Sequence, residues 1–238
     1  MRVTCVPEAA RNGQRFDPNI FTIGFARRAA TYKRADLLFY DPARLEQIAK
    51  KFGGLQIVFS GKAHPHDEPG KAIIRHIFEM AAGVNSEYLR IVYLENYAWE
   101  LGAQLTAGVD LWLNNPQRPY EASGTSGMKA AMNGVPSLSI LDGWWIEGCI
   151  EGFTGWAIED FNTEQEESAS LYEKLEEEIL PLYYSQPLEW QKVMRSSIAL
   201  NGSFFNTNRM LVQYIRDAYY PGKLMVAEIA ALEPAMAK

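Results

Sequence analysis

The chain has 238 residues, of which 47% are hydrophobic and 22% charged, and its formal net charge is −6. This composition is typical of a soluble globular protein with a sizeable core and excludes extensive disorder. Two cysteines, Cys5 and Cys149, are too few for a disulfide framework. The acidic balance argues against nucleic-acid binding, and no apolar run approaches the ~18 residues of a membrane span. We therefore expect a cytoplasmic protein with no nucleic-acid or membrane partner.

Short apolar runs alternate with amphipathic segments along the first 141 residues. Strands are expected at 20–25, 55–59, 89–94, 111–113 and 137–141, and helices at 27–39, 42–52, 70–82, 97–107 and 124–132. The strands are apolar on both faces rather than alternating, which is typical of a sheet covered on both sides. The pattern predicts an α/β fold, a single Rossmann-like, doubly wound parallel sheet. Ligands of such sheets bind beyond the carboxyl ends of the strands.

The character of the chain changes after Asp142. Residues 159–178 hold nine acidic residues and one lysine, which predicts a solvated helix face and its leading loop. Two further helices are expected at 188–200 and 206–219. We expect one domain with carboxyl-terminal helices over residues 1–222, and a frayed tail over 223–238.

A basic segment follows the first expected strand. Arg27, Arg28, Lys33 and Arg34 place four positive charges within eight residues. The amino terminus of a helix favours anions, and arginine suits bidentate contact with phosphate. The segment predicts a phosphate-binding site, and the alternative is a solvated basic helix face.

A glycine- and serine-rich segment, 121–134, leads into another expected helix. Gly124 and Gly127 permit close backbone approach, and Lys129 falls in the first turns of the helix. The hydroxyls that could cap the helix or bind phosphate are those of Ser123, Thr125 and Ser126. The segment lacks the Gly-Lys-Ser/Thr ending of a nucleotide-binding P-loop. A lysine with apolar neighbours, close to groups that can donate to a phosphate, indicates a Schiff-base site. The alternative is an ordinary strand-to-helix loop.

Other candidate side chains give weaker signals. Tyr97 follows a strand and could donate to a phosphate, although such a residue is more often a packing aromatic. His64 and His66 lack a third ligand nearby, so we expect no metal site. Cys149 is expected to be a small buried hydrophobic residue.

Together these motifs resemble the α-glucan phosphorylases, the family of glycogen, starch and maltodextrin phosphorylases, and in particular its short bacterial branch. The segments that carry the resemblance are 25–34, 61–65, 95–97, 121–129, 141–145 and 205–210. They lie in collinear order over nearly the whole chain.

The resemblance implies phosphorolysis of α-1,4-glucan by inorganic phosphate to α-glucose 1-phosphate. It implies pyridoxal 5′-phosphate bound to Lys129, with the cofactor phosphate exchanging a proton with the substrate phosphate. By position, the residues that would hold the cofactor phosphate are Arg27, Tyr97, Thr125 and Ser126. Arg28 and Lys33 would hold the substrate phosphate. The residues that would face the glucosyl hydroxyls are Glu121, Ser123, Gly124 and Tyr32.

The sequence departs from the long animal and plant enzymes at several positions. Arg27 stands where they have lysine, Ala30 where they have histidine, and Ser126-Gly127 where they have Gly-Asn. These departures fit the short bacterial branch.

The resemblance also begins at the second of two Rossmann-like domains of a GT-B glycosyltransferase. We therefore expect the chain to be inactive alone, unless a separate chain supplies the amino-terminal domain. The exposed interdomain face would favour homo-oligomers.

Two alternatives remain at this point. The first is a nucleotide-sugar glycosyltransferase of the same architecture, in which a second glutamate follows the first; Lys129 stands at the position that would carry it after Glu121. The second is a non-catalytic binding or assembly module.

Overall fold

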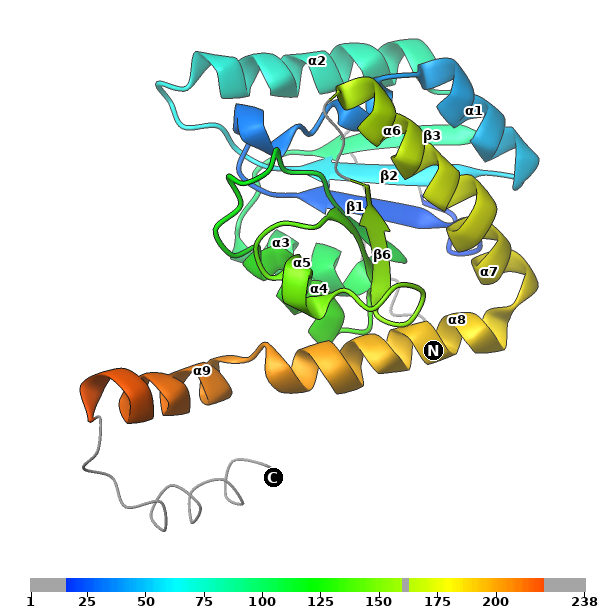
Figure 1. The fold of residues 1–238 in the computed structure, drawn as a ribbon. Coiled ribbons are helices and arrows are strands. Elements are labelled where there is room, and N and C mark those ends of the chain that lie inside the picture. Colours follow the sequence, from blue (N-terminus) through cyan, green and yellow to red (C-terminus); the bar gives the residue numbers. More distant parts are fainter. Residues whose placement is uncertain (1–15, 160–162, 221–238) are drawn as a thin grey trace.

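The computed structural model of the protein describes residues 16–159 and 163–220. In this part of the chain, six parallel strands form one sheet in the order β3-β2-β1-β4-β5-β6 (Figure 1). The strands are β1 Thr22–Ala26, β2 Leu55–Ser60, β3 Leu89–Leu94, β4 Leu111–Asn114, β5 Ser137–Ile140 and β6 Gly155–Ile158. This is the strand order of a Rossmann fold, and it confirms the predicted fold class and the five predicted strands. The predicted tail at 223–238 lies outside the described residues.

The sequence did not reveal β6, the strand at one edge of the sheet. The segment before it, 143–155, contains four glycines, which is typical of a loop. In the structure Gly152 and Gly155 both take positive φ angles. In the structure β6 pairs with β5, and a β-carbon on Gly155 would lie 2.2 Å from the carbonyl oxygen of Ser137. The glycine is therefore required by close contact between strands rather than by a turn.

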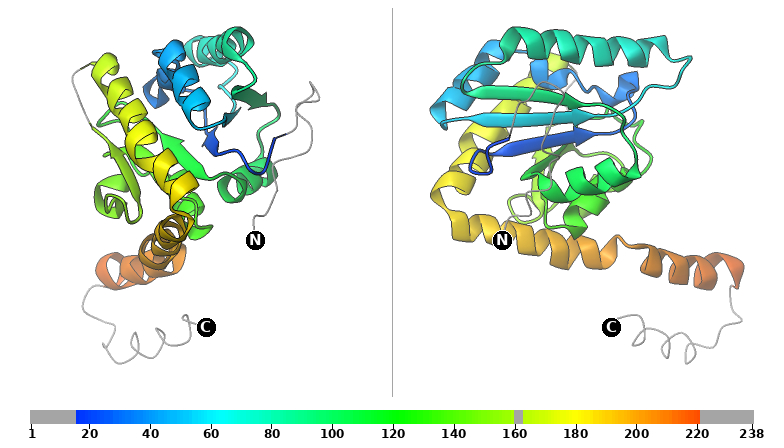
Figure 2. Two further views of the ribbon diagram at one scale, coloured as in Figure 1. Left: turned by 90° about the vertical axis from the view of Figure 1, so that its right-hand side faces the viewer. Right: turned by 180° about the vertical axis from the view of Figure 1, so that it is seen from behind.

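Helices cover both faces of the sheet (Figures 1 and 2). One face packs against α1 Pro42–Lys51, α2 Glu68–Val84, α6 Glu164–Glu173, α7 Leu180–Ser185 and α8 Pro187–Ser196. The other packs against α3 Trp99–Gly108 and α4 Thr125–Met132. Inward residues of one strand divide between the two cores: Ile57 faces the first, and Val58 the second. This division explains why the strands are apolar on both sides.

The basic segment after β1 is not the single helix predicted over 27–39. It forms two short 3₁₀ turns, Thr31–Lys33 and Leu37–Phe39. Arg34 between them has a φ of 46°, in the left-handed region that ends a helix. Asn115 holds this conformation: its side-chain amide donates to the carbonyl of Arg34 at 2.6 Å, and Arg34 Nε donates to the carbonyl of Asn115 at 3.0 Å. Consequently the segment 27–39 does not itself supply an α-helix amino terminus beside Arg27.

The acidic segment also differs in part from its prediction. Thr163 caps α6, accepting from the amide of Glu166 at 3.3 Å, and several of the outer glutamates are exposed as expected. Glu167, however, is only 5% exposed and pairs with Arg34. A local charge pattern does not reveal this, because the partner lies far away in the sequence.

The carboxyl-terminal helices extend past the sheet. After α8, π-helical turns at Ser197–Gly202 lead to α9 Thr207–Tyr214 and further π-helical turns at Ile215–Tyr219. No residue of α9 is buried, and the helix projects away from the body of the molecule (Figure 2). Within residues 16–159 and 163–220, no helix combines the length and the apolar character needed to cross a bilayer.

Candidate functional site

A cationic cluster lies at the point where the strand order of the sheet reverses, which we call the crossover. β1 and β4 are neighbours at this crossover, since the chain runs from β1 towards β3 on one side and from β4 towards β6 on the other. Arg27 directly follows β1, and its Nη1 donates at 2.9 Å to Oδ1 of Asn114, the last residue of β4. The crevice beyond such a crossover is the usual ligand site of open parallel sheets.

Close approach of two loops fixes the backbone of Arg27. Its amide donates to the carbonyl of Ser60 at 3.1 Å. A β-carbon on Gly61 would lie only 2.2 Å from the carbonyl oxygen of Arg27, so only glycine fits there. Tyr93 supports the same loop, because its hydroxyl donates to the Gly61 carbonyl at 3.0 Å.

The carboxylate of Glu121 lies between two cations. Lys33 Nζ donates to Glu121 Oε2 at 2.5 Å, and Arg27 Nη2 donates to the same oxygen. These side chains are only 8–11% exposed. Burial raises the pKa of Glu121, but the two cations outweigh this and hold the pKa below its usual value.

One hydrogen-bond donor of Arg27, its Nε, is not used within the described residues. Burial lowers the pKa of its guanidinium, and Glu121 offsets only part of that effect. Arg27 Nε is buried and has no hydrogen-bond partner among the described residues. A buried donor without a partner is costly, and a bound anion would satisfy it.

Tyr32 and Arg28 lie at the edge of the cluster. Burial raises the pKa of the Tyr32 phenol. Hydrogen bonds to Lys33 and Arg28 together outweigh this effect, so the pKa lies below its usual value. Lys33 Nζ lies 4.4 Å from the centre of the Tyr32 ring. Arg28 is itself exposed, so the open side of the cluster is positively charged.

The loop after β5 binds the backbone of Glu121. Asp142, which is buried, accepts from the amide of Glu121 at 2.8 Å and from that of Gly143 at 2.9 Å. Trp144 donates its amide to the carbonyl of Ser123 at 2.8 Å. The backbone of the glycine- and serine-rich segment is thus fixed to the end of a neighbouring strand.

The glycines at the start of α4 accommodate a tryptophan. Gly124 has a φ of 90°, and β-carbons on Gly124 and Gly127 would both lie 2.9 Å from the ring of Trp144. The glycines therefore allow close approach, as predicted, and the group that approaches their backbone in this structure is the ring of Trp144. Ser126 Oγ accepts from the indole of Trp112 at 3.3 Å, whereas Ser123 and Thr125 are exposed.

Lys129 lies in the second turn of α4 and is exposed, rather than in the apolar surroundings the sequence suggested. Its ammonium makes no hydrogen bond or ion pair with the described residues. Tyr97 is half-buried; burial raises its pKa and Arg27 lowers it, which places the phenol within electrostatic reach of Arg27.

The structure thus brings part of the predicted set into direct contact. The residues of the contacting cluster are Arg27, Arg28, Tyr32, Lys33 and Glu121. Those at the start of α4 that make no hydrogen bond to it within the described residues are Ser123, Gly124, Thr125, Ser126 and Lys129. Sequence reasoning missed Asn114, Asn115 and Asp142, although polar residues directly after predicted strands are a usable signal.

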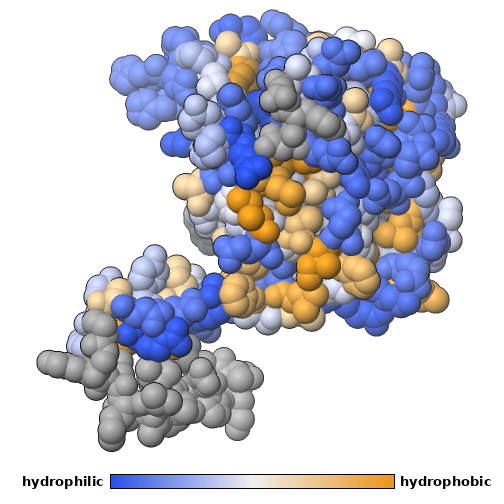
Figure 3. Space-filling model, in the orientation of Figure 1, coloured by the Kyte–Doolittle hydropathy of each residue, from blue (hydrophilic) through white to orange (hydrophobic). Residues whose placement is uncertain are grey.

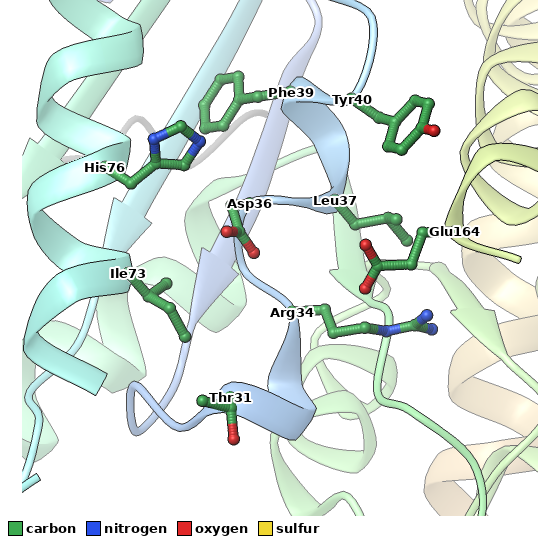
Figure 4. Close-up of a pocket in the computed structure, with 9 residues that line it drawn as sticks. All are labelled: Thr31, Arg34, Asp36, Leu37, Phe39, Tyr40, Ile73, His76 and Glu164. Carbon is green, nitrogen blue, oxygen red and sulfur yellow. The ribbon is translucent and has the colours of Figure 1, made fainter. Parts of the chain in front are cut away.

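A separate pocket of about 350 Å³ lies between the segment after β1, α2 and α6. In Figure 4, Asp36 lies between Ile73 and His76 of α2 on one side and Glu164 of α6 on the other. Of the four cations predicted to bind phosphate, Arg34 lines this pocket, and its guanidinium pairs with Glu167. Within residues 16–159 and 163–220, no group of three or more histidine, cysteine or acidic side chains could hold a metal ion.

Fold and cluster together define a Rossmann-like protein with a concentration of cations at the crossover of its sheet. The family model described as carbohydrate phosphorylase matches residues 17–220. The chain belongs to this family.

Several curated relatives are similar over most of the chain. It is 45% identical over 212 residues to a maltodextrin phosphorylase of Thermococcus litoralis, covering 86% of this chain and 25% of that protein. It is 45% identical over 214 residues to a glycogen phosphorylase of Aquifex aeolicus, covering 85% and 30%. A glycogen phosphorylase of Mycobacterium tuberculosis is 39% identical over 219 residues, covering 87% and 25%. The chain therefore spans between a quarter and a third of the length of these relatives.

Proposed function

We propose that this chain is the cofactor-binding part of an α-glucan phosphorylase, which cleaves α-1,4-glucan with inorganic phosphate to give α-glucose 1-phosphate. The observation that carries the proposal is the buried Nε of Arg27, which lies within a cationic cluster and has no hydrogen-bond partner in the described part of the chain. That donor lies at the crossover of the sheet in a chain that is 45% identical to a maltodextrin phosphorylase.

The residues present fit pyridoxal 5′-phosphate. Lys129 offers an exposed ammonium one turn beyond Thr125 and Ser126, whose hydroxyls lie at the start of α4. Arg27 offers its free Nε, and Tyr97 lies within electrostatic reach of the same guanidinium. When bound, the cofactor would supply a phosphate group that exchanges a proton with the substrate phosphate.

The work of the protein side chains is electrostatic. Two phosphate groups in contact repel strongly, so fixed cations are needed to hold them together. Arg27 would hold the cofactor phosphate, while Arg28 and Lys33 would hold inorganic phosphate on the open side. The residues proposed to face the glucosyl hydroxyls are Glu121, Ser123, Gly124 and Tyr32.

We propose further that these 238 residues by themselves do not turn over glucan and need the rest of a phosphorylase. Apolar side chains support this, because α9 has no buried residue and Leu211 is 53% exposed. Ile146 and Phe153 are exposed near α5 Trp145–Gly148, and hydrophobic residues gather on that face in Figure 3. Such surfaces bind a partner domain or a second copy of the chain, which light scattering would detect.

Absorption spectroscopy tests the cofactor proposal. After incubation with pyridoxal 5′-phosphate and removal of excess, the chain is expected to keep an absorption band of the bound cofactor. Lys129→Ala should abolish the band. Lys192→Ala, which removes an exposed lysine of α8, is the matched control and should keep it.

An assay for glucose 1-phosphate, with maltodextrin and phosphate supplied, completes the test. Turnover by the chain alone would contradict the proposed need for a partner. Tight binding of a nucleotide sugar, without any binding of pyridoxal phosphate, would favour a nucleotide-sugar transferase instead.

A further inference from the structure

The carboxylate of Glu121 pairs with two of the cations that a phosphate group would need. It accepts from both Arg27 Nη2 and Lys33 Nζ, and the second contact is 2.5 Å long. With side chains only 8–11% exposed, water competes weakly for these donors. The chain thus neutralises part of its own cationic cluster.

A carboxylate and a phosphate group cannot share this position. Both are anions that accept hydrogen bonds from the same nitrogens, and at such short separation they repel each other. A phosphate group that reaches Arg27 and Lys33 therefore competes with the carboxylate for these two cations.

We propose that Glu121 is an internal competitor, which holds the phosphate-binding cations until a phosphate group displaces it. This inference rests on the proposed function.

The surroundings of Glu121 suit such an exchange. Its backbone is anchored, since Asp142 accepts from its amide at 2.8 Å, so the side chain can rotate while the main chain stays fixed. The incoming group gains more than Glu121 gives up, because Arg27 Nε has no partner in the described structure. Arg28 on the exposed edge adds a further cation along the path of entry.

The test compares two charge-neutralising variants. Glu121→Gln removes the competitor. Glu167→Gln removes the carboxylate of another buried ion pair, with Arg34, and changes the net charge equally without touching Arg27 or Lys33. Isothermal titration at matched ionic strength would follow pyridoxal 5′-phosphate into the cofactor-free chain and inorganic phosphate into the loaded chain.

We expect Glu121→Gln to bind at least one of the two about tenfold more tightly than the wild type, equivalent to ~1.4 kcal/mol. A gain in the first titration assigns the competition to the cofactor phosphate, and a gain in the second to inorganic phosphate. Glu167→Gln should bind both with wild-type affinity.

Unchanged or weaker binding by Glu121→Gln, with normal binding by the wild type, overturns the inference and leaves the proposed function intact. If the wild type binds neither compound, the proposed function and this inference fail together. Should Glu121→Gln unfold, circular dichroism in phosphate and in chloride of equal ionic strength decides. Refolding in phosphate alone supports the competitor role, and a chain unfolded in both overturns it.

Discussion

The guanidinium of Arg34 and the carboxylate of Glu167 form a buried ion pair that joins the segment after β1 to α6. Arg34 also donates to the carbonyls of Asn115 and Pro116, each at 3.0 Å. These contacts fix the side chain of Arg34, the residue that follows Lys33. The ion pair therefore joins residues that lie 133 positions apart in the sequence.

Arg34→Met is expected to lower the free energy of unfolding by ~3–5 kcal/mol, because the carboxylate of Glu167 would remain buried without its partner. Urea denaturation measures this. The control is Arg44→Met, whose pair with Glu176 spans 3.8 Å at the surface and is expected to contribute about 0–1 kcal/mol. Equal losses in the two variants would contradict a special role for the buried pair.

Gly61→Ala is expected to destabilise the protein by ~1–3 kcal/mol, because the new β-carbon would lie 2.2 Å from the carbonyl oxygen of Arg27. The backbone must shift, and Arg27 with it, so affinity for phosphate should fall as well. Gly83→Ala is the matched control. Apart from the backbone of α2 itself, no atom of the described residues lies within 4 Å of its β-carbon position, and the variant should be ~0.4–1 kcal/mol more stable. Thermal melting and phosphate titration of both variants would check this.

The stability contributed by Glu121 is expected to depend on pH. Because Arg27 and Lys33 hold its folded-state pKa below the usual 4.5, the ionised carboxylate stabilises the fold at neutral pH. That contribution is present above the unfolded-state pKa and is lost as pH falls through the lower folded-state value. The difference in unfolding free energy between the wild type and Glu121→Gln should therefore shrink below about pH 4.5. A difference that stays constant between neutral and acidic pH would refute this.

Cys149 is expected to resist thiol reagents. Burial, followed by the nearby carboxylate of Glu151, raises the pKa of its thiol to about 12. At pH 8 the thiolate fraction is then roughly a thousandfold below that of an ordinary cysteine, and alkylation slows accordingly. A Cys5→Ser background leaves Cys149 as the single thiol for timed iodoacetamide labelling. Labelling at the rate of free cysteine would show that the thiol is not perturbed.

The predictions that held depend on local patterns. The strands from β1 to β5 are recognisable because their residues pack against helices on both faces, so each reads as an unbroken apolar run. Asp41 before Pro42 marks the start of α1, where its carboxylate accepts from the amide of Arg44 at 3.0 Å. Such signals lie within a few residues of the structure that they determine.

The failures involve contacts between distant parts of the chain. The segment 27–39 has helical composition, yet Asn115 holds Arg34 in a left-handed conformation that no local preference predicts. A tryptophan of the loop after β5 packs beside Gly124 and Gly127, a contact that the local sequence does not predict. Glu167 reads as one more surface glutamate until its buried partner is known.

The sequence by itself determined the family, the parallel sheet and the identities of the charged residues near its crossover, because these depend on short motifs and on the spacing of apolar runs. Only the tertiary structure decided that Glu121 lies against Arg27 and Lys33, and that Arg27 Nε has no hydrogen-bond partner among the residues that the structure describes. Ion pairs form between groups that folding brings together, and their geometry depends on every strand and loop that positions them.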